Sequence, residues 1–470
     1  MEHTNTICAI STPQGNGAIA VVRMSGEASL SILDAVFQPV KQKNIRDATP
    51  YTLHFGTIRE SEEALIDEVL VSIFKAPHSY TGEDLVEISC HGSPYIQRKL
   101  MQLLIDKGAR TADPGEFTMR AFENGKMDLA QAEGVADLVA SSSRASHKLA
   151  MQQMRGGFSS EIKNLRNRLL NFISLIELEL DFSEEDVEFA DRNQFIELLS
   201  DINQLIEKLL QSFELGNAIK NGFPVAIAGN TNVGKSTLLN RLLNEEKAIV
   251  TDIAGTTRDV IEDVVNIKGL EFRFIDTAGI RETGDQIESI GIERTFDQID
   301  KAQIVLLLVD ANQDLDYILE TIQKVEQRIE GKSKKLLVLL NKIDLVETEL
   351  QLKEIEHAIR KHLTTEDEFI RISAKTGHNT EQLVEILLDA ANFSELQEND
   401  IIVTNTRHYE ALKRAHESLQ RAREGLTNEL PTDLLAMDVR DVIHYLGEIT
   451  GQISTDEILG NIFQNFCIGK

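Results

Sequence analysis

The octapeptide Gly-Asn-Thr-Asn-Val-Gly-Lys-Ser at residues 229–236 decides the fold of the middle of the chain. It follows the apolar run 224–228 and precedes the helix-prone segment 237–243, which is the order strand, glycine-rich loop, helix. Glycines let backbone N–H groups turn toward phosphates, and the helix dipole favours the same negative charge. We therefore expect Lys235 to contact the β- and γ-phosphates of a nucleoside triphosphate during catalysis, and Ser236 to ligate Mg²⁺.

Three downstream motifs specify the nucleotide as GTP. An Asp-Thr-Ala-Gly motif at 276–279 follows a strand-like run, so its aspartate can reach the Mg²⁺ shell and its glycine N–H the γ-phosphate. In the Asn-Lys-Ile-Asp motif at 341–344, Asp344 can accept two hydrogen bonds from guanine, whereas adenine would leave this carboxylate unpaired. A Ser-Ala-Lys motif at 373–375 completes the base pocket. The residues expected to bind GTP are Asn232, Val233, Gly234, Lys235, Ser236, Thr237, Thr251, Asp252, Ile253, Ala254, Gly255, Thr256, Thr257, Asp276, Thr277, Ala278, Gly279, Asn341, Lys342, Asp344, Ser373, Ala374 and Lys375.

Two positions in these motifs affect the mechanism. Many regulatory GTPases place a glutamine after the Asp-x-x-Gly motif to orient the attacking water, but this chain has Ile280 there. Either hydrolysis is very slow, or another group positions the water. Asn232, inside the phosphate loop, could hold a monovalent cation against the phosphates, where it would neutralise developing charge. Asn232 could equally be an ordinary loop residue.

Composition indicates a soluble multidomain protein. The chain has 470 residues and a net charge of −28, which argues against nonspecific nucleic-acid binding by the chain as a whole. Its apolar runs are strand-length, and its first residues do not resemble a signal peptide, so we expect a cytoplasmic protein without membrane contact. Three scattered cysteines are too few for a disulfide framework or a zinc site.

The pattern along the chain predicts three domains. Residues 1–120 mix short β-rich runs with one helix, as in an α+β domain. Residues 121–220 and 381–470 are helical, with long amphipathic segments at 161–180 and 193–215. Between them, residues 221–380 alternate strands and helices, which is typical of a doubly wound parallel sheet. We expect an α/β P-loop GTPase domain inserted into one helical domain.

Four segments together resemble the MnmE (TrmE) family of bacterial tRNA-modification GTPases: 79–84, 122–133, 251–259 and the Phe-Cys-Ile-Gly-Lys motif at 466–470. The resemblance covers the whole chain. It implies a homodimer, formed through the N-terminal domain, that acts with the flavoprotein MnmG. Together they add a carboxymethylaminomethyl group to C5 of the wobble uridine of certain tRNAs. The carbon comes from 5-formyl- or methylene-tetrahydrofolate, and potassium activates the GTPase.

The resemblance also implies specific ligands. Potassium would be held by Asn232, Thr251, Ile253 and Thr256, and Mg²⁺ by Ser236 and Thr257. Glu288 would take over orientation of the attacking water, although by itself it reads as an exposed acid. The folate site would consist of Arg23, Glu87, Lys126 and Lys470. The apolar segment 458–463 suggests a docked terminal helix that delivers Lys470.

The sequence leaves open the role of Cys467 and the choice between two functions. The Cys467 thiolate could attack C6 of a uridine in an auxiliary catalytic role, but it could also be a merely packed or exposed thiol. Cys90 and His91 do not form a catalytic pair, because neighbours on a strand point to opposite faces. The alternative function is a GTP-switched factor in ribosome assembly or translation, without modification chemistry.

Overall fold

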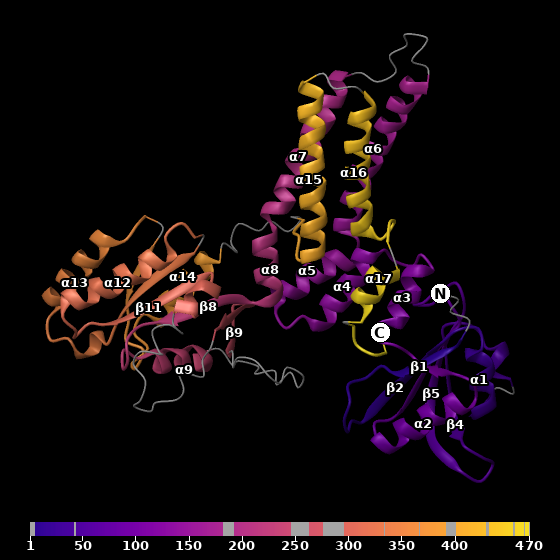
Figure 1. Cartoon of the computed structure of the whole chain (residues 1–470). Helices are drawn as coiled ribbons and strands as arrows, with labels where there is room; N and C mark the ends of the chain where they lie inside the picture. The colour runs from indigo at the N-terminus through magenta and orange to yellow at the C-terminus, as the bar shows by residue number, and fades with distance from the viewer. Residues whose placement is uncertain are drawn as a thin grey trace. The chain divides into compact units, whose positions relative to one another are not determined.

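The computed structural model describes residues 5–41, 44–181, 192–245, 263–275, 296–332, 334–365, 367–391, 401–428, 432–454, 456–464 and 466–469 (Figure 1). The chain forms two compact units. The first comprises Met1–Ala140, Ala150–Asn203 and Ala411–Lys470, and the second Ser141–Leu149 and Gln204–Glu410. Among the described residues, no helix combines the length and apolar character that crossing a bilayer requires. The three-domain division made from the sequence stays a prediction.

A seven-stranded sheet forms the N-terminal part of the first unit. Its order is β3-β4-β5-β6-β2-β1-β7, and all neighbours are antiparallel except β1 and β7. The strands are β1 (Ile7–Ile10), β2 (Ile19–Ser25), β3 (Phe37–Pro39), β4 (Thr52–Arg59), β5 (Leu65–Phe74), β6 (Leu85–His91) and β7 (Arg110–Thr111). The β-rich runs predicted near residues 18–24, 67–74 and 84–89 are therefore confirmed as β2, β5 and β6.

The two faces of this sheet differ in character. One is covered by α1 (Ser29–Val36) and α2 (Pro94–Asp106), whose Leu33 and Leu104 pack with Val22 and Val71 of the strands in one apolar core. Alternation along each strand sends the intervening side chains to the opposite face. Cys90 is buried and His91 exposed, which confirms that the two point apart.

Helices make up the rest of the first unit. They are α3 (Glu116–Glu123), α4 (Leu129–Ala140), α6 (Gly157–Asp181), α16 (Thr432–Thr450) and α17 (Asp456–Phe463), with parts of α5 (Arg144–Met154), α7 (Arg192–Gln211) and α15 (Thr406–Thr427). The helix α16 packs along α6, although the two are far apart in sequence. The helix α17 packs on α3 and α4 through Phe463, Phe122 and Leu129, so the predicted docked terminal helix is confirmed.

The second unit is built on a six-stranded sheet with the order β13-β12-β11-β8-β10-β9. Its strands are β8 (Phe223–Ala228), β9 (Asp263–Ile267), β10 (Leu270–Phe274), β11 (Ile304–Asp310), β12 (Lys335–Asn341) and β13 (Glu368–Arg371). Helices α8 (Phe213–Asn221), α9 (Lys235–Glu245), α12 (Leu315–Ile329), α13 (Glu349–His362) and α14 (Thr380–Ala390) accompany them. The predicted α/β architecture is confirmed.

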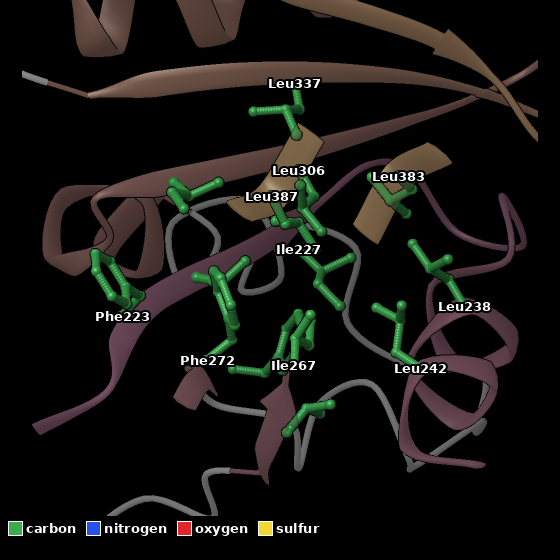
Figure 2. Packing of buried hydrophobic residues seen from close by; sticks show 14 of the residues in the cluster. Phe223, Ile227, Leu238, Leu242, Ile267, Phe272, Leu306, Leu337, Leu383 and Leu387 are labelled. Atoms are coloured by element: carbon green, nitrogen blue, oxygen red, sulfur yellow. The ribbon is translucent and has the colours of Figure 1, made fainter. Parts of the chain in front are cut away.

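Both faces of this sheet are covered, which explains the uninterrupted apolar runs of its central strands. On one face, Ile227, Leu306 and Leu337 pack with Leu238 and Leu242 of α9 and with α14, as Figure 2 shows. On the other face, the alternate residues, such as Val305 and Val338, pack with α12 and α13. This packing on both faces fixes the ends of β8, β11 and β12.

Two details differ from the sequence-based expectations. The sheet is not wholly parallel, because β9 is an antiparallel edge strand that pairs with β10 through a tight turn. Lys268 and Gly269 in this turn both have positive φ, at 48° and 89°, as such a hairpin requires. The helix expected over 193–215 is divided at Ser212 into α7 and α8.

The break at Ser212 marks the place where the chain enters and leaves the α/β part. The Ser212 Oγ accepts a hydrogen bond from the Val403 N–H at 3.1 Å, so the returning chain meets the outgoing helix there. Gly216 of α8 lies so close to this segment that a Cβ would sit 2.2 Å from the Val403 carbonyl oxygen. Phe213 also stacks on Tyr409, with ring centroids 4.4 Å apart.

Candidate functional site

The phosphate loop connects β8 to α9 in the predicted order. Gly229 has φ 141°, and a Cβ there would lie 2.4 Å from the Leu308 carbonyl oxygen of β11. Gly234 has φ 104°, and a Cβ there would lie 2.4 Å from the Asn341 side-chain nitrogen. Both glycines are thus required by backbone conformation and by close neighbours, and not only by a ligand.

The Lys235 ammonium group lies over this loop. It donates hydrogen bonds to the carbonyl oxygens of Gly229 at 2.7 Å and Asn230 at 2.8 Å. Burial lowers the pKa of Lys235, because the charged form loses hydration. A triphosphate beside this amine would favour the charged form again. Ser236 and Thr237 occupy the first turn of α9, with Ser236 half-buried and Thr237 exposed.

Asn232 is exposed and has φ 62°, in the left-handed region. Asparagine tolerates this conformation better than most residues, so loop geometry alone can account for its presence. Its side chain is nevertheless exposed beside the phosphate-binding glycines. Its suggested partners for potassium, Thr251, Ile253 and Thr256, lie outside the described residues. So do the other residues of 251–257, the motif Asp276–Gly279, Ile280 and the proposed water-orienting Glu288.

Asn341 connects the phosphate loop to the base-binding loop. This residue is 2% exposed, and its Nδ2 donates to the Val233 carbonyl oxygen at 2.7 Å. Its Oδ1 accepts from the Ala374 N–H at 2.9 Å. One buried amide thus joins three motifs that the sequence places far apart.

The other residues of the two base-binding motifs, 341–344 and 373–375, have hydrogen-bond partners of their own or are exposed. The Asp344 carboxylate accepts from the Ser373 hydroxyl at 2.7 Å, which orients it at the rim of the loop. Lys342 has φ 63°, and its ammonium group donates to Asp310 at 2.7 Å. Lys375 follows the buried Ala374 and is exposed.

Two residues that support the base-binding loop, Asp310 and Arg241, were not identified from the sequence. Burial would raise the pKa of Asp310, but hydrogen bonds from Lys342 and Asn312 outweigh it and lower the pKa. A usable signal existed, since Asp310 ends a buried strand as Asn341 does. Arg241 of α9 donates to the Thr376 carbonyl oxygen at 3.3 Å, and its guanidinium group lies against Gly377. No pattern in the sequence marked it.

A second candidate site lies on the face of the N-terminal sheet that α1 and α2 do not cover. Arg23 of β2 and Glu87 of β6 are register partners, so their side chains share one face. The Arg23 Nη2 and Nε donate to the Glu87 Oε1 at 2.7 and 3.0 Å. The guanidinium group also lies over the rings of Tyr80 and Phe117, 5.4 and 5.7 Å from their centroids. Two residues that the resemblance assigns to one site therefore form a direct ion pair that contacts two aromatic rings.

The C-terminal residues dock beside this pair. The Gly469 carbonyl oxygen accepts from the Ser11 hydroxyl at 3.1 Å and from the Arg23 Nη1 at 3.4 Å. Cys467 is exposed, and its carbonyl oxygen accepts from the Gly115 N–H at 3.4 Å. Lys470 lies outside the described residues, but its neighbour reaches Arg23. The other two thiols, Cys8 and Cys90, are buried, which raises the pKa of each to about 11.

Lys126 lies in a short segment that holds the loop carrying Tyr80. Its ammonium group donates to the Pro77 carbonyl oxygen at 2.9 Å, and the Asn124 amide donates to the Thr81 carbonyl oxygen at 2.7 Å. The Tyr80 hydroxyl shares a hydrogen bond with Thr118 at 2.8 Å, and burial raises the Tyr80 pKa. The motif at 79–84 thus supports Arg23 through Tyr80.

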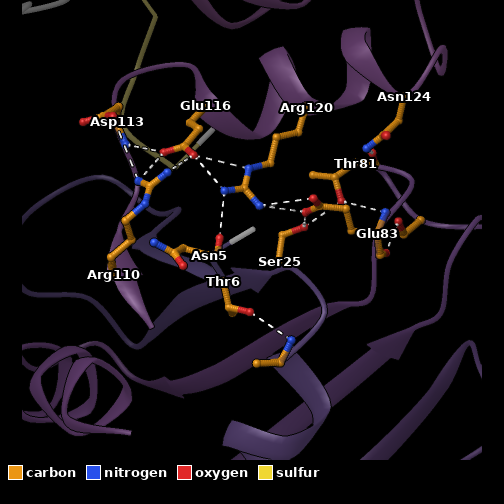
Figure 3. Close-up of polar contacts among 12 residues, drawn as sticks. Asn5, Thr6, Ser25, Thr81, Glu83, Arg110, Asp113, Glu116, Arg120 and Asn124 are labelled. Atoms are coloured by element: carbon orange, nitrogen blue, oxygen red, sulfur yellow. Dashed lines mark hydrogen bonds and ion pairs between the residues drawn. The ribbon is translucent and has the colours of Figure 1, made fainter. Parts of the chain in front are cut away.

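A buried ion network holds this loop to α3, as Figure 3 shows. Arg120 and Glu116 are each 1% exposed and are joined at 2.9 Å. Arg120 also pairs with Glu83 at 3.0 Å, and Arg110 pairs with Glu116. Burial would raise the Glu116 pKa, but hydrogen bonds from Arg110, the Asp113 N–H and Arg120 lower it overall. Sequence reasoning missed the network, because Arg110, Glu116 and Arg120 resemble ordinary surface charges and their partner Glu83 lies 37 residues before Arg120.

Comparison with known proteins covers nearly the whole chain. A family model described as the MnmE helical domain matches residues 129–467, and one described as the N-terminus of the GTP-binding protein TrmE matches residues 6–126. The chain is 56% identical to a "tRNA modification GTPase MnmE" of Bacteroides thetaiotaomicron over 467 residues, 99% of each chain. It is 54% identical to proteins of the same name from Christiangramia forsetii and Flavobacterium johnsoniae, over 100% of each chain.

Proposed function

The chain belongs to the MnmE family of tRNA modification GTPases, and from this premise we propose its reaction, its one-carbon donor and its assembly. As a member of this family it binds GTP and Mg²⁺, and it hydrolyses GTP in connection with tRNA modification. Both family models cover the flanks of the GTPase part. They leave no support for the alternative of a ribosome-assembly or translation factor without modification chemistry.

The proposed reaction adds a carboxymethylaminomethyl group to C5 of the wobble uridine of certain tRNAs, with MnmG as partner and a tetrahydrofolate derivative as carbon donor. The observation that carries this proposal is the Arg23–Glu87 pair with residues 466–469 docked beside it. The pair is partly exposed, at 19% and 26% of the two side chains, on a base of two aromatic rings. A carboxylate beside aromatic rings suits a flat ring that carries paired donors.

The contacts of the pair suit a folate in detail. Glu87 uses Oε1 for Arg23, and its Oε2 has no hydrogen-bond partner among the described residues, so it can accept from a pterin donor. The carboxylates of a glutamate tail attract cations, a role for which Lys126 and Lys470 are the candidates. Cys467 is exposed in the same segment, where a thiol could assist attack on a uridine.

The GTPase part suits activation by potassium. Asn232 presents an exposed side chain beside the phosphate loop, and Ser236 has a half-buried hydroxyl at the start of α9. With Thr251, Ile253 and Thr256, Asn232 would hold potassium, which supplies positive charge against the phosphates. Ser236 and Thr257 would hold Mg²⁺. Because Ile280 cannot orient water, Glu288 takes that role in this proposal.

Dimerisation would use the exposed part of this face of the N-terminal sheet, which β4 and β5 form. Leu53 and Phe55 of β4 and Leu70 of β5 are 66%, 51% and 46% exposed, and pairing puts all three on one face. Ser72 pairs with both Leu53 and Glu87, so this apolar patch is on the same face as the Arg23–Glu87 pair. A homodimer formed here would bury the patch and bring the folate pair close to the second subunit.

Binding of 5-formyltetrahydrofolate to the full-length protein tests the central step of this proposal. Glu87→Gln turns one acceptor into a donor that faces the pterin donors, so we expect the dissociation constant to rise roughly 10- to 100-fold. Glu68→Gln on the neighbouring strand β5 is the matched control, since Glu68 is exposed. Equal folate affinity of the Glu87→Gln variant and the wild type would contradict the proposed site.

A further inference from the structure

Residues 138–160, which include the helix α5, carry a net positive charge within this acidic chain. Residues 138–160 contain no aspartate or glutamate, whereas 76 of the 470 residues are acidic, so about four would be expected in this stretch. The same stretch contains Arg144, Lys148 and Arg155, together with His147. The local charge is therefore positive in a chain whose net charge is −28.

The three strong cations lie on one stripe of the helix. At 3.6 residues per turn, Arg144, Lys148 and Arg155 fall within about 40° of one another and span roughly 16 Å. All three are exposed, and so is His147. The opposite side, with Ala145, Ser146, Ala150 and Gln153, is buried.

Local hydrogen bonds define both ends of the helix. At its start, Ser143 and Ser146 each accept the other's backbone N–H at 3.1 Å, a reciprocal cap. The Arg155 N–H continues the helical hydrogen bonding to the Met151 carbonyl oxygen. Gly156 then ends the helix with φ 82°.

Within the described part of the chain, none of the three cations has an acidic partner. The next helix provides the contrast, because Lys163 and Arg168 of α6 pair with Asp128 at 2.7 Å and Asp201 at 3.0 Å. Arg144 also lies in the first turn, where the helix dipole favours an anion over a cation. Anionic groups from outside the chain would complement all three positions.

We propose that the stripe of Arg144, Lys148 and Arg155 binds the phosphate backbone of the tRNA substrate. The proposal rests on the tRNA-modifying function of the family and adds to it the surface that contacts RNA. Net negative charge repels RNA over most of the molecule, so a contact needs a place where cations stand without acids. Phosphate contacts of this kind position the nucleic acid and do not read its sequence.

Salt dependence of tRNA binding tests the proposal. The full-length protein is titrated with an unmodified tRNA transcript at several KCl concentrations, as wild type and as the triple variant Arg144→Gln, Lys148→Gln, Arg155→Gln. Glutamine matches lysine and arginine in helix propensity, so α5 is preserved. The loss of three phosphate contacts should lower the slope of log Kd against log salt by about 2 to 3. The Kd at low salt should rise roughly tenfold or more.

Two control variants separate the effect of the stripe from the effect of a change in net charge. Lys107→Gln, Lys353→Gln, Lys361→Gln removes three exposed lysines elsewhere and changes the net charge equally, so it should leave the slope nearly unchanged. Arg144→Lys, Arg155→Lys keeps the charges and should keep most of the wild-type slope. The GTP hydrolysis rate without tRNA should be the same in all variants, which confirms that they are folded.

Three results would overturn the proposal. They are a stripe variant that binds tRNA like the lysine control, a wild type with no salt-dependent tRNA binding, and a stripe variant that keeps tRNA affinity but no longer binds a partner protein. The last result would make α5 a protein interface. Failure of the wobble-uridine proposal looks different, because tRNA binding would still depend on the stripe while the wobble nucleoside stayed unmodified.

Discussion

Replacement of Arg120 by methionine tests the buried ion network most sharply. The guanidinium group is 1% exposed and donates to Glu83, Glu116 and the Asn5 carbonyl oxygen, at 3.0, 2.9 and 2.9 Å. Methionine fills similar volume but offers no donor, so the Asn5 carbonyl loses its partner and Glu83 loses its cation. Removing one partner of a buried ion pair typically costs about 3–5 kcal/mol.

The matched control is Arg110→Met. Arg110 bonds the same Glu116 but is 36% exposed, and Arg120 remains to neutralise the carboxylate. Exposed ion pairs contribute about 0.2–1 kcal/mol, so this variant should lose about 1 kcal/mol. The two substitutions thus remove the same kind of side chain, once where it is buried with three partners and once where it is partly exposed.

Native-state hydrogen exchange of the β1 and β2 amides measures the local effect without requiring two-state unfolding of the whole chain. At about 1.4 kcal/mol per tenfold change, Arg120→Met should lower protection by roughly two to nearly four orders of magnitude. Arg110→Met should lower it less than tenfold. If the two variants lose equal protection, burial does not set the strength of this network, and the reasoning fails.

Four further predictions follow from other contacts. Asn341→Ala should raise the Kd for GTP on the order of 100-fold in equilibrium binding, because two buried hydrogen bonds that join three motifs are lost; an unchanged Kd would refute that link. Asn232→Ala should remove the excess of the GTP hydrolysis rate in K⁺ over Na⁺, and a preserved ratio would exclude the cation site. Phe55→Glu with Leu70→Glu should give monomers in sedimentation, unlike Leu350→Glu on α13, and dimers in both would place the interface elsewhere. The folded state lowers the Glu116 pKa, so the ionised carboxylate stabilises the fold fully above the ordinary value of 4.5. This stabilisation is lost as pH falls through the pKa of the folded state. The melting temperature of Glu116→Gln should therefore fall less with acid than that of the wild type, and an equal fall would contradict this role.

Much of the second unit was predictable because its central strands are buried on both faces. Strands of this kind appear as continuous apolar runs, as at 304–309 and 336–340. Each run is followed by a polar residue, Asp310 or Asn341, that hydrogen-bonds to the neighbouring loops. The strand β9 was not predictable in this way. Its sequence, Asp-Val-Val-Asn-Ile, is short and mixed, and only pairing with β10 at the sheet edge makes it a strand.

The folate-like site could be predicted only in part. Arg23, Glu87 and the C-terminal residues came from resemblance, and the sequence could not show that sheet register makes the first two a pair, since they lie 64 residues apart. Tyr80 and Phe117 contact the Arg23 guanidinium group, but Tyr80 was noted only as part of the segment 79–84, without a role, and Phe117 was not identified. Arg120 and Glu116 have the i, i+4 spacing of a helical ion pair, but such pairs are usually solvent-exposed, and burial depends on partners as distant as Glu83.

Mass spectrometry of tRNA wobble nucleosides tests the central claim most directly. Cells that lack this protein are compared with cells that regain the wild-type chain or its Glu87→Gln variant. We expect carboxymethylaminomethyl-type uridines to disappear without the protein, to return with the wild type and not to return with Glu87→Gln. Unchanged wobble nucleosides in cells that lack the protein would contradict this claim.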